Sequence, residues 1–123
     1  MNERITNFHL GPWEAEIGYS QSVRVGDRVI VSGTVGDEER CKDMESQLVS
    51  AFAAIAETLA HDGATLANVV KETAYCVDIE ALKKCQETRK KIYGGHLPAT
   101  TWVEVRRLYS PGHLVEIEVE AVL

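Results

Sequence analysis

The two neighbouring segments at residues 22–25 and 28–35 constrain the fold of this chain most. Both are rich in β-branched side chains, which favour extended strands. The dipeptide Gly26-Asp27 between them suits a tight turn, although Asp-Gly is the more usual order in such turns. The sequence therefore predicts an antiparallel β-hairpin.

Two later segments, residues 100–108 and 114–123, alternate in the same manner and predict two further strands. In the first of them, Thr100 and Trp102 fall on the same face, because successive side chains of a strand point to opposite faces. In the second, Glu116 shares its face with two more glutamates, a pattern that a solvated strand surface also produces.

Helical periodicity predicts two helices between these strands. Apolar residues recur at steps of four, four, three and four in the list Met44, Leu48, Phe52, Ile55 and Leu59. This amphipathic helix is expected to stop near Gly63. Residues 79–93 predict a second helix, which the pair Gly94-Gly95 ends.

The remaining segments complete the prediction of an α+β fold. Residues 69–78 are apolar on both pleat faces, with Val69 and Thr73 on the same face, and predict a central strand. Residues 4–7 predict a weak first strand, followed by a turn at Gly11-Pro12-Trp13. The order β-β-β-α-β-α-β-β predicts one domain over residues 1–123, with two helices on one face of the sheet. A partner subunit is expected to cover the other face.

Charge and composition exclude several classes of function. A formal charge of -6 opposes binding to a nucleic-acid backbone. One predicted helix carries a basic cluster, consisting of Lys83, Lys84, Arg89, Lys90 and Lys91. We interpret this cluster as a solvated helix face. No nucleic-acid partner is expected.

Cysteine, histidine and hydropathy patterns predict a cytoplasmic protein without bound metal. The 3 cysteines, Cys41, Cys76 and Cys85, form no Cys-x-x-Cys pair and are expected to be packing residues. The 4 histidines lack the short spacings of metal sites. No apolar run reaches the roughly 18 residues that span a membrane, and the first residues resemble no signal sequence. We expect no contact with a membrane.

Four stretches of the chain carry a family resemblance: residues 18–36 (GYSQSVRVGDRVIVSGTVG), 70–73 (VKET), 98–108 (PATTWVEVRRL) and 115–121 (VEIEVEA). They resemble the signature segments of the Rid (YjgF-type, L-PSP-like) imine deaminases. The resemblance implies a chorismate-mutase-like fold, with a mixed sheet and two helices on one face. It also implies a homotrimer that binds small molecules in clefts between subunits. The implied reaction hydrolyses a 2-imino or 2-enamino acid to a 2-keto acid and ammonia without a cofactor or metal.

Carrying the family's cleft residues onto this sequence gives six positions. They are Tyr19, Ser32, Gln86, Thr100, Trp102 and Glu116. The resemblance implies catalytic roles for Glu116 and Tyr19, with Glu116 orienting a water or accepting a proton. The other four would contact the substrate, although Gln86 is equally well explained as a surface residue.

Thr100 departs from the family pattern, which has an arginine there to bind the substrate carboxylate, and places the chain in an arginine-lacking branch. Hydrogen bonds to charged groups contribute about 1.5 to 3 kcal/mol each, so a hydroxyl lowers carboxylate affinity by roughly tenfold to a few hundredfold. Arg106 and Arg107 lie about 20 Å away along the strand. Trp102 replaces a small cysteine, which predicts either stacking with a ring-bearing ligand or a closed cleft.

Three functions are compatible with this reading. The first is hydrolysis of a reactive imine or enamine of altered substrate class, a reaction at a C=N bond. The second is a non-catalytic trimer that binds or senses a small molecule. The third, endoribonuclease or translation-inhibitor activity, is least favoured because the chain is acidic and offers no suitable pair of histidines.

Overall fold

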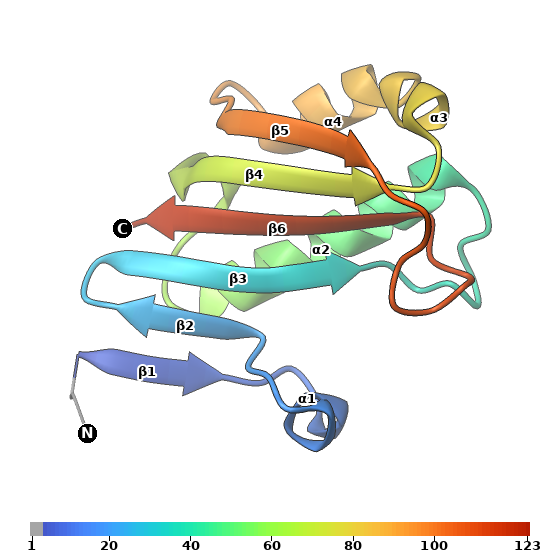
Figure 1. Ribbon diagram of the computed structural model, residues 1–123. Helices are drawn as coiled ribbons and strands as arrows, with labels where there is room; N and C mark the ends of the chain where they lie inside the picture. The colour runs from blue at the N-terminus through green and yellow to red at the C-terminus, as the bar shows by residue number, and fades with distance from the viewer. Residues whose placement is uncertain (1–3) are drawn as a thin grey trace.

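The computed structural model describes residues 4–123, which form one six-stranded sheet with helices behind it (Figure 1). The elements, in chain order, are β1 (Ile5–Phe8), α1 (Pro12–Ile17), β2 (Ser22–Val25), β3 (Arg28–Val35), α2 (Met44–His61), the 3-10 turn η1 (Leu66–Asn68), β4 (Val69–Cys76), α3 (Ile79–Lys83), α4 (Gln86–Tyr93), β5 (Ala99–Glu104) and β6 (Val115–Val122). The strand order is β1-β2-β3-β6-β4-β5. Only the β4–β5 pair is parallel among these strands, so the predicted α+β fold with a mixed sheet is confirmed.

Helix α2 fills the core on one face of the sheet, as its periodicity predicts. Leu48, Ile55 and Leu59 have 0% exposed surface. They pack in one cluster with the inward side chains of β3 and β6. Complete burial of such a side chain stabilises the fold by about 1.5 to 3 kcal/mol. Helices α3 and α4 lie on the same side, behind β4 and β5 (Figure 1).

Strand β6 shows how the sheet separates its two faces. Its residues alternate between buried and partly exposed along the whole strand, with Ile117 at 0% exposure toward the helices. The alternate side chains, including Glu116 and Glu118, point to the face without helices. This open face also exposes Ile30 by 42% and Val103 by 36%.

The predicted hairpin is confirmed at β2 and β3. Val25 pairs with Arg28, so Gly26 and Asp27 form the two-residue turn. Gly26 adopts φ 60°, a left-handed conformation that glycine accepts without strain.

Helix α1 is the first correction to the sequence prediction, which placed a turn at Gly11-Pro12-Trp13. Pro12 instead begins the helix, at a position that tolerates a residue without an amide hydrogen. The buried carboxylate of Glu14 accepts hydrogen bonds from the amides of Leu10 (3.1 Å) and Gly11 (3.3 Å). These bonds stabilise the helix start, where backbone amides lack helical partners.

Apart from shifts of one or two residues at strand ends, three further details differ from the prediction. The helix expected over 79–93 is two helices that meet at Lys84-Cys85. The strand expected over 100–108 ends at Glu104, after which the Arg107 side chain donates back to the carbonyls of the following turn. The pairing of β4 shifts between Val69 and Lys71, which moves Val69 to the buried helix side rather than beside Thr73. Within the described part of the chain, no helix is long and apolar enough to cross a bilayer.

Candidate functional site

A pocket of about 350 Å³ opens beside Glu116, on the face of the sheet opposite α2 and next to the end of α1. Its lining consists of Ile17, Tyr19, Ser32, Gly33, Val35, Tyr109, His113 and Glu116. The structure thus brings together Tyr19, Ser32 and Glu116, three of the six positions that the sequence singles out. They come from the loop after α1, from β3 and from β6.

Glu116 is the strongest candidate for acid–base chemistry in this pocket. Burial raises the pKa of its carboxyl group, the neighbouring Glu118 raises it further, and His113 opposes the shift. A raised pKa brings both protonation states closer to neutral pH, which general acid–base catalysis requires. The carboxylate lies against Gly33, where any larger side chain would collide with it.

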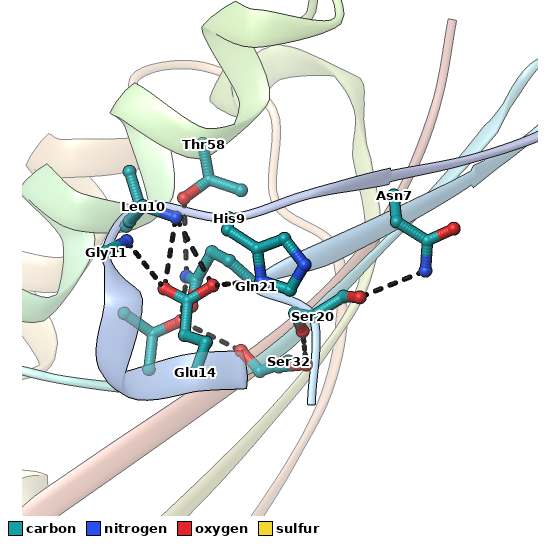
Figure 2. A network of polar contacts seen from close by, with 10 residues as sticks. Asn7, His9, Leu10, Gly11, Glu14, Ser20, Gln21, Ser32 and Thr58 are labelled. Atoms are coloured by element: carbon teal, nitrogen blue, oxygen red, sulfur yellow. Dashed lines mark hydrogen bonds and ion pairs between the residues drawn. The ribbon is translucent and has the colours of Figure 1, made fainter. Parts of the chain in front are cut away.

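Tyr19 owes its place to Glu14 and the end of α1. Gly18 ends the helix with φ 113°, and the amides of Gly18 and Tyr19 both donate to the carbonyl of Glu14, at 2.8 and 2.9 Å. The same residue's carboxylate accepts from the chain before the helix and lies 3.2 Å from His9 Nδ1 (Figure 2). Glu14 is 0% exposed, so both ends of α1 are fixed by one buried residue.

Hydrogen bonds to Ser20 and Gln21, the two residues before β2, hold Ser32 in place (Figure 2). Its hydroxyl donates to the carbonyl of Ser20 at 2.6 Å, and its amide donates to the carbonyl of Gln21 at 2.9 Å. The buried amide of Gln21 donates in turn to Thr34 and Thr58. Because the Ser32 proton is already engaged, this hydroxyl can serve a ligand only as an acceptor.

Two lining residues, Tyr109 and His113, escaped the sequence analysis. They lie in the irregular segment between β5 and β6, where no periodicity marks a buried side chain. The His113 side chain is only 13% exposed, and its Nε2 atom lies 3.8 Å from Glu38 Oε2. Tyr109 is 78% exposed at the pocket. The signal available in the sequence was the position of His113 three residues before Glu116.

Thr100 and Trp102 lie in a different cluster, on the helix side of β5, around the buried carboxylate of Glu72. The Thr100 hydroxyl donates to Glu72 Oε1 at 2.6 Å, and Trp102 Nε1 lies 3.4 Å from the same oxygen. Both reach one carboxylate, which confirms that they share a face. Tyr93 donates to the other oxygen at 2.7 Å. Burial, and then the nearby Glu72 charge, raise the pKa of the Tyr93 hydroxyl.

Arg89 completes this cluster and changes the electrostatic interpretation of position 100. Its Nε atom donates to both Glu72 oxygens, at 2.9 and 3.1 Å, and its guanidinium lies over the rings of Tyr93 (5.0 Å) and Trp102 (5.4 Å). A cation therefore does lie beside Thr100, contributed by α4. Glu72, at 0% exposure, neutralises it, as buried charges require. Arg89 is thus no part of a solvated basic face.

The two clusters stay apart within one chain. Strands β6 and β4 separate β3 from β5, and the two sets of side chains point to opposite faces of the sheet. Gln86, the sixth predicted position, is an exposed residue at the start of α4. A single subunit therefore holds Tyr19, Ser32 and Glu116 at one site, and Thr100 with Trp102 at another.

All three cysteines are free thiols; Cys76 and Cys85 belong to the packed core, whereas Cys41 is half-buried in the loop between β3 and α2. Cys76 and Cys85 are buried, and burial raises the pKa of both thiols. Such thiols are poorly reactive, since the thiolate is the nucleophile. Across residues 4–123, no group of three or more histidine, cysteine, aspartate or glutamate side chains lies close enough to hold a metal ion.

Known proteins share both the sequence pattern and the fold of this chain. The family model described as Endoribonuclease L-PSP matches residues 12–123. A RutC family protein of Pyrococcus abyssi (PYRAB12510) is 34% identical over 85% of this chain and 84% of its own. The crystal structure of Rv2704 from Mycobacterium tuberculosis, described as a YjgF/YER057c/UK114 family member, has TM-score 0.90 and 38% identity, covering 97% of this chain and 99% of that one. YyfA of Yersinia pestis, described as a Rid family protein, has TM-score 0.80 and 28% identity, covering 86% and 88%.

Proposed function

Because this chain belongs to the Rid/YjgF family, which the Endoribonuclease L-PSP model describes, we propose that it hydrolyses an imine or enamine that carries no carboxylate. The observation that supports this most is the partly buried Glu116, whose pKa is raised inside a pocket of about 350 Å³. Tyr19 and Ser32 would orient the ligand there.

The reaction needs one carboxyl group that can take and return a proton. The Glu116 carboxylate accepts a proton from water as the water oxygen bonds to the imine carbon and the C=N electron pair moves to nitrogen. Glu116 then returns this proton to nitrogen, which gives a carbinolamine. A second transfer, from the hydroxyl through Glu116 to nitrogen, accompanies cleavage of the C–N bond. The products are a carbonyl compound and ammonia, so atoms and charges balance.

The remaining predicted residues would join this pocket from a neighbouring subunit. We propose the homotrimer that the family resemblance implies, in which Gln86, Thr100 and Trp102 of one subunit face Glu116 of the next. The open sheet face, with Ile30 and Val103 exposed, supports contact between subunits, and Thr100 and Trp102 would reach the next subunit from the edge strand β5.

The charge of the second cluster supports an uncharged substrate. In the Glu72–Arg89 pair, one carboxylate balances one guanidinium. Thr100 adds a neutral hydroxyl whose proton is already donated to Glu72. A substrate carboxylate would therefore meet no free cation at this cluster, and its desolvation would lack compensation.

Two probes test this proposal: 2-iminopropanoate generated in situ, which is an acid, and benzophenone imine, which is an uncharged N–H ketimine. We expect ammonia release from benzophenone imine to be accelerated by the wild type and not by Glu116→Gln, with little acceleration for 2-iminopropanoate. Faster hydrolysis of the acid probe would refute the substrate class. Binding that changes Trp102 fluorescence without turnover of either probe would instead support the sensing alternative.

A further inference from the structure

We infer that His113 is a positioning residue that controls the protonation of Glu116, and that Gln47 of α2 fixes His113 for this role. The inference deepens the proposed function, since it concerns the same pocket. It rests on the backbone contacts around His113, on the 3.8 Å distance between its Nε2 atom and Glu38 Oε2, and on the shared lining of the pocket.

Gln47 holds the chain on both sides of His113. Its side-chain Nε2 donates to the carbonyl of Gly112 at 3.0 Å, and its Oε1 accepts from the amide of Leu114 at 2.8 Å. The same Nε2 donates to the carbonyl of Cys41 at 3.0 Å, which joins the loop after β3 to this segment. Gln47 is 1% exposed in the rigid helix α2, so the backbone of an otherwise irregular segment is anchored where His113 attaches.

Glu38 lies beside the imidazole of His113. It belongs to the loop that Gln47 anchors through Cys41, and its Oε2 atom lies 3.8 Å from His113 Nε2. Any side chain at Gly112 would collide with the Glu38 carboxylate, so glycine permits this approach. The Glu38 carboxylate therefore flanks the imidazole on the side of Nε2.

The other imidazole nitrogen of His113 is buried without a protein partner. Nδ1 has no hydrogen-bond partner among residues 4–123. A buried polar atom left unpaired costs about 1 to 3 kcal/mol, and this atom belongs to a residue that lines the pocket. The Glu116 carboxyl lines the same pocket, and the positive charge of a protonated His113 stabilises its ionised form.

Several other groups face this pair. Glu118 follows Glu116 on β6 and opposes its ionisation, while Tyr19 and Tyr109 line the pocket from the α1 and β5–β6 segments. Arg107 lines the adjoining hollow, together with Glu116 and Glu118. Among the residues that line this pocket, His113 is the one whose side chain can carry a positive charge. Its charge opposes the effect that burial and Glu118 have on the Glu116 carboxyl group.

The test is a carboxyl titration of Glu116, followed by NMR in protein labelled with carbon-13 at the glutamate carboxyl groups, without any substrate. We expect His113→Gln to raise the pKa of Glu116, because the opposing positive charge is lost. His113→Lys should lower it, since the charge becomes permanent. Glu38→Gln and Gln47→Leu should each raise it by less than His113→Gln does.

A purely structural role for His113 would not give shifts of opposite sign in the glutamine and lysine variants. His61→Gln is the matched control, because His61 stacks on Phe8 at 4.0 Å, outside the pocket, and should leave the titration unchanged. Equal titrations of Glu116 in wild type, His113→Gln and His113→Lys would overturn the inference.

Turnover provides a separate measurement with benzophenone imine. We expect the acidic side of the pH–rate profile to move to higher pH in His113→Gln and to lower pH in His113→Lys. The role of His113 in catalysis would be contradicted if variants that hydrolyse the probe and keep the wild-type circular dichroism spectrum showed the same pH–rate profile as the wild type. If neither the wild type nor any variant hydrolyses a probe, the proposed function fails. The titration without substrate still decides whether His113 controls the protonation of Glu116.

Discussion

Glu72→Gln should shift the preference of the protein toward acidic substrates, because it removes the charge that neutralises Arg89. The amide has the volume of the carboxylate, although its one oxygen can accept only one of the two hydrogen bonds that Thr100 and Tyr93 donate to separate oxygens of Glu72. The guanidinium then becomes an uncompensated cation beside position 100. The single substitution therefore supplies the positive charge that Thr100 does not.

The magnitude follows from the hydrogen bonds that a freed guanidinium can make. Each bond to a charged group contributes about 1.5 to 3 kcal/mol. One such bond to a substrate carboxylate raises affinity by roughly 10- to 150-fold, at about 1.4 kcal/mol per factor of ten. The same substitution breaks a buried ion pair and should lower the free energy of unfolding by about 3 to 5 kcal/mol.

The assay is the ratio of kcat/KM for 2-iminopropanoate to that for benzophenone imine, measured through ammonia release. Glu87→Gln is the matched control, because it removes the same charge from a glutamate that is 68% exposed and pairs with Lys90 at 2.9 Å. Urea denaturation shows whether each variant remains folded. An unchanged ratio in folded Glu72→Gln would refute the idea that charge balance at this cluster determines the substrate class.

Three further predictions concern the pocket and the open face. Because the pKa of Glu116 is raised in the native state, the folded protein keeps this proton at a pH where the unfolded chain has lost it. The free energy of unfolding of the wild type therefore falls as the pH rises through that range. Glu116→Gln should unfold at a higher urea concentration than the wild type at pH 7, and at the same concentration at pH 3. Gly33→Ala should displace the Glu116 carboxylate and slow ammonia release, whereas Gly95→Ala, in open space, should not; equal rates would contradict the close approach. Ile30→Lys should convert the proposed trimer to monomers in size-exclusion chromatography with light scattering, and an unchanged mass would exclude that face from the contact.

The regular elements were predictable because their physical cause is local. Alternation identifies β3 and β6, and a four-three spacing identifies α2, since each pattern follows from the geometry of one element. Helix α1 was missed because Gly-Pro-Trp is typical of a turn. The helix depends on the Glu14 carboxylate, which accepts hydrogen bonds from the amides of Leu10 and Gly11 before it.

The sites were less predictable because their partners lie far apart in sequence. Glu72 is expected to face solvent in a strand, and its burial depends on Arg89, 17 residues away on another element. His113 carries no periodic signal, and its placement depends on Gln47, more than sixty residues earlier. Tyr19, Ser32 and Glu116 could be anticipated because the family resemblance supplied them as a set, whereas their separation from Thr100 and Trp102 required the three-dimensional fold.

The position of β6 in the sheet also bears on how the protein is made. It follows all the other strands in sequence, yet it lies between β3 and β4 and joins the hairpin half of the sheet to the β4–β5 half. During synthesis, the two halves have no common strand until residues 115–122 leave the ribosome. The emerging chain therefore carries two open strand edges until β6 pairs with both of them, and it is most exposed to aggregation before that pairing.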